Sequence, residues 1–472
     1  MLVLSTMLAV KGYSEVQKSK DVVTNDHVNK AVAVYVTARD TGERLKERES
    51  VDFEKLSGGV ATISVNPDIK FQTIEGFGGA FTEAAAYALS KVAPEKRTEV
   101  LKAYFDPVSG LGYSLCRTHI NSCDFSLGNY AYDEVAGDTE LKHFSIERDK
   151  KLLIPLIKDA MAVPGAEFKV FASPWSPPAW MKTNGEMNHG GKLRPEYAAT
   201  WAKYFAKYIN AYSAEGVAIW GITVQNEPAA TQRWDSCIYS TEEERDFVKN
   251  HLGPTLAGDG LGKIKIMIWD HNKNIIIERV RGVLSDPNAA KYVWGVGFHW
   301  YRGEHFEKLS ELNRMYPDKK LLFTEGCVEK GPKVGSWQTG EKYGHNIIGD
   351  LNNFAVGWVD WNIALDQQGG PNHVGNFCDA PIIADNDTNT VIYQSSFYYL
   401  GHFSKFIRPG AVRVGCTVKN PALETTAFRN MDGRIVVVTM NRTDETVGFT
   451  LGQSDRTAKL TSPAHSIMSL VF

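Results

Sequence analysis

The chain has 472 residues, of which 43% are hydrophobic, so it can bury a large core, and its length favours one large domain with a smaller one. Its 52 basic and 55 acidic residues give a formal net charge of -3, which excludes the strongly basic surface of a nucleic-acid-binding protein. Beyond the N-terminus no apolar run is long enough to span a bilayer, so we expect no stable membrane insertion. The expected partner is a neutral molecule.

The chain begins with an apolar stretch. Met1 to Val10 are apolar or small and precede Lys11, which resembles the apolar part of a secretory signal without its basic segment. We therefore predict that residues 1–30 are a signal remnant or a flexible N-terminus. The first alternative implies an exported protein (secreted, periplasmic or surface-associated) whose signal peptide is truncated. Six scattered cysteines without a C-x-x-C pair predict buried thiols.

Both ends of the chain have a sequence pattern typical of antiparallel β-sheet. Residues 31–66 and 408–472 contain short apolar runs between turn residues, such as Val60 to Val65 and Ile435 to Met440. Because these two segments flank a longer central region, we predict that they form one accessory β-sandwich beside it.

The central region, residues 67–407, alternates apolar strand runs with amphipathic helical runs. One predicted helix covers Arg194 to Ala214, and another begins at Ser240 with the capping residue Glu243. The predicted strands are Gln72 to Gly76, Tyr113 to Ile120, Phe168 to Ala172, Ile219 to Val224, Ile264 to Trp269, Val293 to Phe298, Lys320 to Thr324 and Ala355 to Val359. Eight such strands fit the α/β class as a closed (β/α)8 TIM barrel better than an open sheet.

Two acids follow predicted strands and are the candidate catalytic pair. Glu227 precedes Pro228, which predicts an extended backbone at a strand end, and Glu325 follows the apolar run that ends at Thr324. Barrel enzymes place their active sites at the carboxyl ends of the strands, and glycosidic bond cleavage needs two carboxyl groups there. A separation of about 5 to 5.5 Å gives retention and about 6.5 to 9.5 Å gives inversion, which the sequence leaves open. The acid of the pair should have a raised pKa because its partner is negatively charged.

Simpler interpretations exist for these residues. A single Glu at a strand end is usually a solvated loop residue, and His299, Trp175 or Trp361 could be ordinary packing. Cys116 and His119 would face opposite sides of a strand, so we predict no metal site there. The run Gly76 to Gly79 lacks the full dinucleotide-binding pattern and is predicted to form a tight turn.

Several motifs together carry a family resemblance. They are Glu75-Gly76-Phe77-Gly78-Gly79-Ala80, Ser122-Cys123-Asp124-Phe125-Ser126, Ala172-Ser173-Pro174-Trp175, Asn226-Glu227-Pro228, Thr324-Glu325-Gly326-Cys327, Trp358-Val359-Asp360-Trp361-Asn362, Gly369-Gly370-Pro371-Asn372, Asp379 to Ile383 and Leu400-Gly401-His402-Phe403-Ser404-Lys405-Phe406. The chain thereby resembles, over nearly its whole length, the glucosylceramidase group of glycoside hydrolase family thirty.

The resemblance implies a retaining hydrolase that cleaves β-linked glucosides by double displacement without a cofactor. Glu227 would be the acid/base and Glu325 the nucleophile, and Asn226 would bond the sugar 2-hydroxyl. The substrate-binding residues implied are Asp124, Trp175, Asn226, His299, Trp361, Arg117, Tyr301 and Asn376, among which Arg117 would support the carboxylates. The substrate would be a carbohydrate or a glycolipid.

The sequence departs from the animal glucosylceramidases at two places. His119 stands in Arg117-Thr118-His119 where they have proline, and His373 stands where they have tryptophan. Since His373 lies in a predicted mouth loop, the leaving group stays open between a glucosylceramidase or β-glucosidase type and a β-1,6-glucanase type. The alternative from another class is a carbohydrate-binding barrel without turnover.

Overall fold

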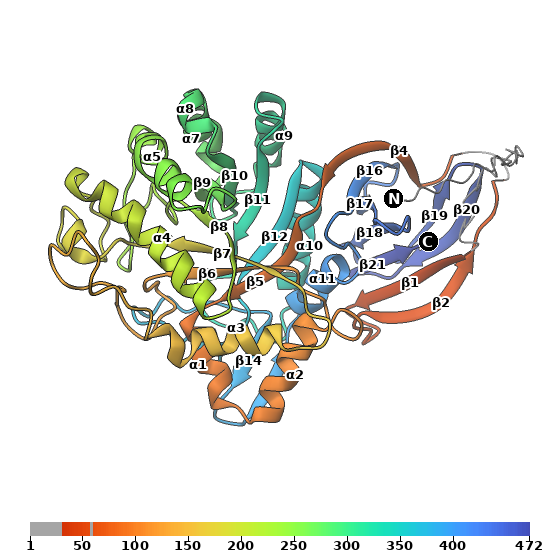
Figure 1. Ribbon diagram of the computed structural model, residues 1–472. Coiled ribbons are helices and arrows are strands. Elements are labelled where there is room, and N and C mark those ends of the chain that lie inside the picture. The colour runs from red at the N-terminus through yellow and green to blue at the C-terminus, as the bar shows by residue number, and fades with distance from the viewer. Residues whose placement is uncertain (1–30, 57–59) are drawn as a thin grey trace, which may run out of the picture.

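Eight parallel strands close into a barrel in a computed structural model of the protein, which describes residues 31–56 and 60–472 (Figure 1). In chain order the barrel strands are β5 (Gly76–Phe81), β6 (Leu115–Ile120), β7 (Lys169–Pro174), β8 (Ile219–Thr223), β9 (Lys265–Asn272), β10 (Val293–His299), β11 (Lys320–Glu325) and β12 (Ala355–Asn362). Each strand pairs in parallel with its neighbours, and β12 closes onto β5. The predicted TIM barrel is confirmed.

Helices surround this barrel, as its parallel connections require. They are α1 (Glu83–Lys91), α2 (Pro94–Phe105), α3 (Leu153–Met161), α4 (Ala198–Ala214), α5 (Thr241–Phe247), α6 (Gly253–Gly258), α7 (Ile276–Leu284), α8 (Pro287–Ala290), α9 (Phe306–Met315), α10 (Trp337–Asn352) and α11 (Ser395–Ser404). The predicted helix over Arg194 to Ala214 starts with a 3-10 turn at Pro195–Tyr197 and continues as α4. The capping box of Ser240 and Glu243 opens α5 as predicted.

The first barrel strand lies further along the chain than predicted. The structure places β4 (Ile63–Thr73) in the outer sheet and starts the barrel strand at Gly76, so the prediction of a strand over Gln72 to Gly76 is wrong. The Gly76 to Gly79 run, predicted to be a turn, is itself β5. A Cβ atom at Gly78 would lie 1.9 Å from the carbonyl oxygen of Leu115, so the missing side chain lets β5 approach β6 closely.

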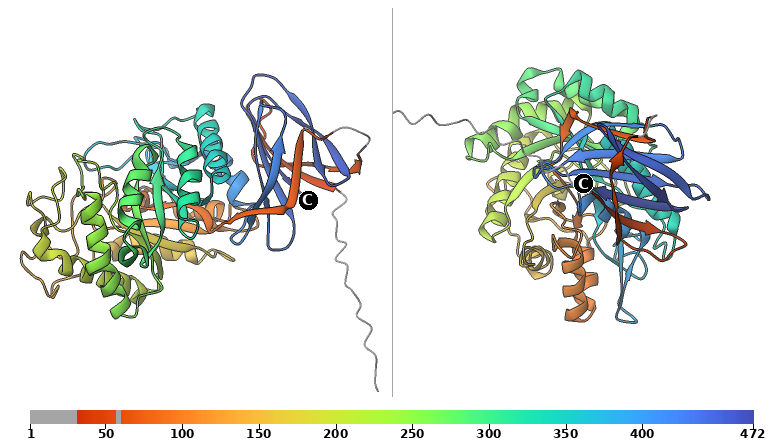
Figure 2. Two further views of the ribbon diagram at one scale, coloured as in Figure 1. Left: turned by 90° about the horizontal axis from the view of Figure 1, so that it is seen from above. Right: turned by 90° about the vertical axis from the view of Figure 1, so that its right-hand side faces the viewer.

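Ten strands from the two ends of the chain form the accessory sheet, whose order is β2-β1-β21-β18-β17-β16-β4-β19-β20-β3. They are β1 (Ala31–Ala38), β2 (Lys46–Asp52), β3 (Glu54–Lys55), β4, β16 (Val412–Val418), β17 (Leu423–Arg429), β18 (Ile435–Asn441), β19 (Val447–Gln453), β20 (Arg456–Ser462) and β21 (Ser466–Val471). Figure 2 shows the red N-terminal strands among the blue C-terminal ones, beside the barrel. The predicted sandwich of both termini is confirmed, and β4 runs past the predicted boundary at residue 66.

A buried histidine joins the two units. His402, in α11, approaches Ser469 of β21 at 2.8 Å through Nδ1 and Thr37 of β1 at 2.9 Å through Nε2. Burial lowers the pKa of His402 to about 3, so the ring is neutral and one nitrogen donates while the other accepts. The barrel and the sandwich are thus fixed together by a polar contact as well as by packing.

The remaining elements are short. A small sheet of β13 (Leu365–Asp366), β14 (Ile382–Asp385) and β15 (Thr390–Tyr393) follows β12, and short 3-10 or π turns occupy Asp149–Lys151, Ala179–Met181, Val248–Leu252 and Lys273–Ile275. The predicted signal remnant, residues 1–30, lies outside the described residues. None of the helices in the described ranges is both long and apolar enough to cross a bilayer. All six cysteines are free thiols, and only Cys416 is partly exposed.

Candidate active site

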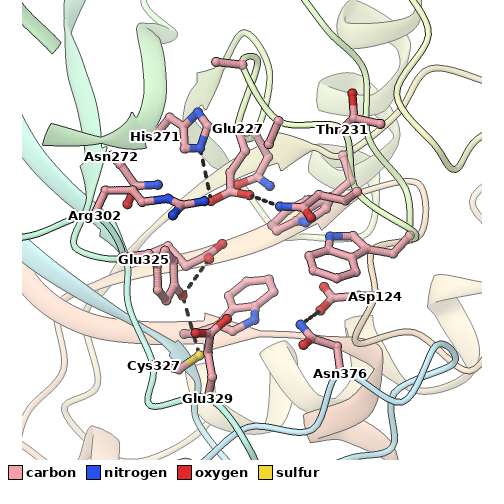
Figure 3. Close-up of a pocket in the computed structure, with 18 of the residues that line it drawn as sticks. Asp124, Glu227, Thr231, His271, Asn272, Arg302, Glu325, Cys327, Glu329 and Asn376 are labelled. Atoms are coloured by element: carbon pink, nitrogen blue, oxygen red, sulfur yellow. Dashed lines mark hydrogen bonds and ion pairs between the residues drawn. The ribbon is translucent and has the colours of Figure 1, made fainter. Parts of the chain in front are cut away.

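A cavity of about 630 Å³ opens at the carboxyl ends of the barrel strands, and both candidate carboxylates line it (Figure 3). Glu325 is the last residue of β11, and its side chain is 8% exposed. Its Oε2 accepts a hydrogen bond from Arg117 at 2.7 Å, and its Oε1 accepts one from the Tyr301 hydroxyl at 2.9 Å. Glu325 is therefore held in one orientation from both sides.

Glu227 lies beyond the end of β8 and has an unusual backbone. Its φ is 48°, in the left-handed region, so the prediction of an extended backbone before Pro228 is wrong. The strained conformation is held because the Glu227 N–H donates to the Asp270 carbonyl at 3.0 Å and its own carbonyl accepts from Ala230 at 2.9 Å. Strain of this kind is stored where function needs a side chain aimed in one direction.

Arg117, in β6, organises the floor of the site. Its guanidinium is fully buried and ion-paired with Glu325 and with Asp270, the latter at 2.8 Å. The same group donates to Asn226 at 2.9 Å and to Ser173 at 3.0 Å. The Arg117 guanidinium of β6 therefore contacts side chains from β7, β9 and β11 and from the segment after β8.

His299, the last residue of β10, lies between the two carboxylates. Its Nδ1 is 3.4 Å from Glu227 Oε1 and 3.9 Å from Glu325 Oε1, so the sum of these distances is the upper limit for the separation of the two oxygens. That limit admits the spacing of retaining enzymes, about 5 to 5.5 Å, and excludes the upper part of the inverting range. Its Nε2 lies 3.0 Å from Asp270, which fixes the ring.

The charges in this cluster move several pKa values. Burial opposes a charged His299, but Glu325, Asp270 and Glu227 together raise its pKa to about 9. Burial also opposes a charged Asp270, yet Arg117 and His299 hold the pKa of Asp270 well below its usual range. At neutral pH the cluster beneath the cavity therefore contains Arg117 and His299 as cations and Asp270 as an anion.

The two candidate carboxylates are shifted in opposite directions. Burial raises the pKa of Glu227, but the neighbouring His271 and His299 outweigh it and lower the pKa below its usual value. Burial and the neighbouring Glu227 raise the pKa of Glu325 above its usual value, against the effects of His299 and Arg117. In the free site the raised pKa thus falls on Glu325, and the ring nitrogen nearest to Glu227 is Nδ1 of His299.

The opposite end of the cavity carries Asp124. Its Oδ2 accepts hydrogen bonds from Asn376 and Asn372, both at 3.1 Å, and burial raises the pKa of Asp124 to about 7 although both amides oppose this. Trp175 and Trp361 stack nearby with ring centroids 5.0 Å apart, and both line the cavity. This end combines aromatic faces with acceptors and donors that can bind sugar hydroxyls.

The structure brings most of the predicted site residues together. The predicted residues that line the cavity are Asp124, Trp175, Asn226, Glu227, Tyr301, Glu325, Trp361 and Asn376. Arg117, expected to support the carboxylates, is fully buried and contacts Glu325. His299, predicted to bind substrate, is also fully buried and contacts the carboxylates instead of lining the cavity.

Other cavity residues were not predicted. His271 lies 3.6 Å from Glu227, and Gln232 donates to Glu227 at 3.1 Å. The position of His271, in β9 immediately after Asp270, was a usable signal because it follows a predicted strand. Gln232 lies in a loop, where no periodic pattern marks it.

His119, which we did not expect to bind a metal, is used in local structure. Its Nε2 accepts from the Glu83 N–H at 3.1 Å and its Nδ1 donates to the Asn121 carbonyl at 2.6 Å, so both ring nitrogens serve local structure. In residues 31–56 and 60–472 no group of three or more His, Cys, Asp or Glu side chains is placed to hold a metal ion.

Two domain models of one protein family match most of the chain. The Glycosyl hydrolase family 30 TIM-barrel domain matches residues 74–407, and the Glycosyl hydrolase family 30 beta sandwich domain matches residues 410–470. The chain belongs to glycosyl hydrolase family 30. It is therefore a glycoside hydrolase by family, as the motifs predicted.

Individual family 30 proteins resemble the chain along nearly its whole length. Lysosomal acid glucosylceramidase of Mus musculus is 39% identical over 424 residues, which is 86% of this chain and 82% of that protein. The crystal structure of SrfJ from Salmonella typhimurium has a TM-score of 0.90 and 38% identity, covering 94% of this chain and 99% of that one. The endo-β1,6-glucanase BT3312 has a TM-score of 0.86 and 31% identity, covering 93% and 99%.

The buried Arg117 leads to a stability prediction for this family 30 chain. Replacing Arg117 by Met leaves Asp270 and Glu325 buried without their cation, so we expect the free energy of unfolding to fall by about 3 to 5 kcal/mol. Urea denaturation followed by circular dichroism measures the change. The control is Arg434→Met, which removes an ion pair whose arginine side chain is 56% exposed. Its urea midpoint should equal that of the wild type within error. Equal midpoints for both variants would contradict the role of Arg117.

Proposed function

We propose that this family 30 hydrolase cleaves β-linked glucosides with retention, with Glu325 as nucleophile and Glu227 as acid/base. The observation that carries the proposal is the different environment of the two carboxylates around His299. Arg117 and Tyr301 orient Glu325, and a raised pKa makes its anion more basic and so a better nucleophile. Glu227 lies beside the cation His299, which supplies a proton.

In the first step, a carboxylate oxygen of Glu325 forms a bond to the anomeric carbon while the bond to the leaving oxygen breaks. Glu227 must give that oxygen a proton. Transfer of the Nδ1 proton of His299 to Glu227 leaves a neutral histidine and a protonated carboxyl, so the total charge of the pair is unchanged. The products are a glucosyl ester on Glu325 and a released alcohol.

In the second step, Glu227 takes a proton from a water molecule, and the water oxygen attacks the anomeric carbon from the opposite face of the ester bond. The bond to Glu325 breaks, the carboxylate is regenerated and the sugar leaves in the β configuration, and the proton taken up by Glu227 returns to His299. Asn226 supports both steps. Its Oδ1 accepts from Arg117, which leaves the amide NH2 as a donor for the sugar 2-hydroxyl.

The leaving-group side of the cavity favours a polar alcohol. Figure 3 shows His271, Asn272 and Arg302 close to Glu227 and Thr231 at the same end, and Gln232 donates to Glu227, although Trp269 and Ile275 also line the cavity. Such polar groups would be left without hydrogen-bond partners by an acyl chain, whereas a sugar satisfies them. Of the two activities named for the relatives, glucosylceramidase and endo-β1,6-glucanase, we therefore favour the second type for this chain.

A substrate panel tests the proposal. The panel contains an aryl β-glucoside, an aryl β-gentiobioside (two β-1,6-linked glucose units), β-1,6-glucan and glucosylceramide, and proton NMR follows the anomer released first from the best substrate. We expect the β anomer and a preference for the glucan series over glucosylceramide. The α anomer would reject retention, and sugar binding without turnover of any member would support the silent carbohydrate-binding barrel.

The shared proton leads to a pH prediction. Because the pKa of His299 is about 9, the proton is present below that pH and is lost above it, so kcat/KM should fall on the alkaline side near pH 9. In His299→Gln the proton must lie on Glu227 alone, and we expect the alkaline limb to move by at least about one unit to lower pH. Phenyl β-glucosides suit the assay because their poor leaving group needs the acid. His143→Gln, at a 61% exposed histidine, is the control, and identical profiles for the wild type and His299→Gln would reject the shared proton.

We also propose that the protein is exported, which the apolar stretch Met1 to Val10 supports. Fractionation of cells that express the full chain, followed by N-terminal sequencing, tests this. The mature protein should lack that stretch and be found outside the cytoplasm, and an intact N-terminus in the cytoplasmic fraction would reject it.

A further inference from the structure

A second, shallow hollow of about 540 Å³ adjoins the catalytic cavity. Its lining includes Glu329 and Asn376, which also line the catalytic cavity, so the two spaces adjoin at these residues. The hollow extends from them over Arg233, Lys330, Gln368 and Phe377. None of the steps proposed above uses it.

The hollow lies away from the acid/base. In Figure 3, Glu227 lies at one end of the cavity with His271, whereas Glu329 and Asn376 lie at the other end. Asn376 also donates to Asp124, at the end of the cavity where Trp175 and Trp361 stack. We assign the glucosyl unit to that end because its aromatic faces and polar groups can bind a sugar. Since the leaving group departs on the side of Glu227, a ligand in the hollow would be attached to the glucosyl unit on the side away from the cleaved bond.

The walls of the hollow are fixed by backbone hydrogen bonds. The segment after β11 pairs with the segment before β14, through a bridge between Glu329 and Cys378 and a bond of 2.9 Å from the Gly331 N–H to the Phe377 carbonyl. A Cβ atom at Gly370 would lie 3.0 Å from the Phe377 ring, so the glycine lets that ring lie close against the backbone. The ring is thus a fixed platform.

The lining suits a neutral sugar. Phe377 is 37% exposed and offers an aromatic face on which the C–H face of a sugar ring can pack. Arg233 and Glu329 are both exposed, and neither side chain makes a hydrogen bond or ion pair to another residue in the described part of the chain. Arg233 offers only hydrogen-bond donors and Glu329 only acceptors. Together they can donate to one sugar hydroxyl and accept from the next.

We infer that this hollow is a second glycosyl-binding subsite, which holds a glucose unit linked to the one being transferred. The inference rests on the proposed function, because it takes Glu227 to mark the leaving-group side. The subsite would therefore select for substrates that carry at least two linked sugar units. A substrate with a single sugar, such as glucosylceramide, leaves the hollow empty, whereas a β-glucan chain fills it and is cut at an internal bond.

Two chromogenic donors with the same leaving group test the inference, p-nitrophenyl β-glucoside and p-nitrophenyl β-gentiobioside. We expect the wild type to release nitrophenol and intact gentiobiose, with a higher kcat/KM on the disaccharide. Phe377→Ala should lower kcat/KM on the gentiobioside by about three- to tenfold and leave the monoglucoside within twofold. The laminaribioside and cellobioside analogues identify the linkage, and Met431→Ala, an exposed residue of the sandwich, is the control.

Several results would overturn the subsite. The first is an equal loss of kcat/KM in Phe377→Ala on the mono- and disaccharide donors. The second is a kcat/KM on every disaccharide donor that does not exceed that on the monoglucoside. The third is release of the terminal glucose before nitrophenol. If no donor is hydrolysed, the proposed function fails, and calorimetry still tests the subsite. Glu325→Gln should then bind gentiobiose more tightly than glucose, and adding Phe377→Ala should remove the difference. Equal affinities for both sugars in Glu325→Gln would reject it.

Discussion

Replacing Glu325 by Gln is expected to lower kcat on an aryl β-glucoside or β-gentiobioside by about 10⁴-fold or more, the loss typical of removing a nucleophile. The amide keeps the shape of the side chain, and its oxygen can still accept from Arg117 while its NH2 faces the Tyr301 hydroxyl as a donor, but it cannot form the glucosyl ester. Stopped assays at saturating substrate measure the change. A burst of nitrophenol should also be absent.

A matched control separates chemistry from folding. Glu167→Gln changes an exposed glutamate before β7 and should leave kcat unchanged. The thermal midpoint of Glu325→Gln should stay near that of the wild type, because a buried carboxylate with a raised pKa is costly to keep charged. A kcat within tenfold of the wild type would contradict the assignment of Glu325.

Replacing Glu227 by Ala is expected to lower kcat by about 10² to 10⁴-fold on substrates with poor leaving groups. The loss should be smaller for an activated aryl donor, because a good leaving group needs little protonation. Azide should restore turnover of that donor, since a small anion fits the space left by the side chain and attacks the glucosyl ester without a general base. The product should be a β-glycosyl azide, and mass spectrometry with NMR identifies it.

The configuration of that product decides the roles of the two acids. An α-glycosyl azide from Glu227→Ala would mean that the nucleophile had been removed, which reverses the assignment. Glu167→Ala, treated with azide in the same way, should give no glycosyl azide above the wild-type level. Failure of azide to change either rate or product would contradict the role of Glu227 as acid/base.

The sequence predicted the barrel because each of its eight units carries a local signal. Apolar strand runs alternate with helical stripes, and caps such as Ser240 mark where helices begin. The two catalytic candidates were found for a similar reason, since Glu325 ends an apolar run and Glu227 follows one. Their roles came from the family resemblance, because nothing local separates an acid from a nucleophile.

The errors concern backbone detail that depends on distant contacts. The Gly76 to Gly79 run resembles a turn, and only its close approach to Leu115 makes it a strand. Pro228 disfavours a left-handed Glu227 locally, but the bond from Glu227 to the Asp270 carbonyl overrides that preference. In both places tertiary contacts outweigh local propensity.

The electrostatics of the site and the second hollow could not be predicted from the sequence either. His299 ends a strand, but its place between two carboxylates depends on strand pairing, which sets β10 beside β11 and beside β9, itself the neighbour of β8. The second hollow depends on two loops that pair across about fifty positions of sequence, at Glu329 and Cys378. Neither arrangement has a periodic signal that a pattern could reveal.

The central claim is that a covalent glucosyl intermediate forms on Glu325, and trapping it is the most direct test. The enzyme is incubated with an activated 2-deoxy-2-fluoro-β-glucosyl donor, or with the matching gentiobiosyl donor, which slows hydrolysis of the ester more than its formation. Peptide mass spectrometry should then show one added fluoroglycosyl group on the peptide that contains Glu325 and none in Glu325→Gln. The same label on Glu227, or turnover of the donor without any labelled peptide, would contradict the account.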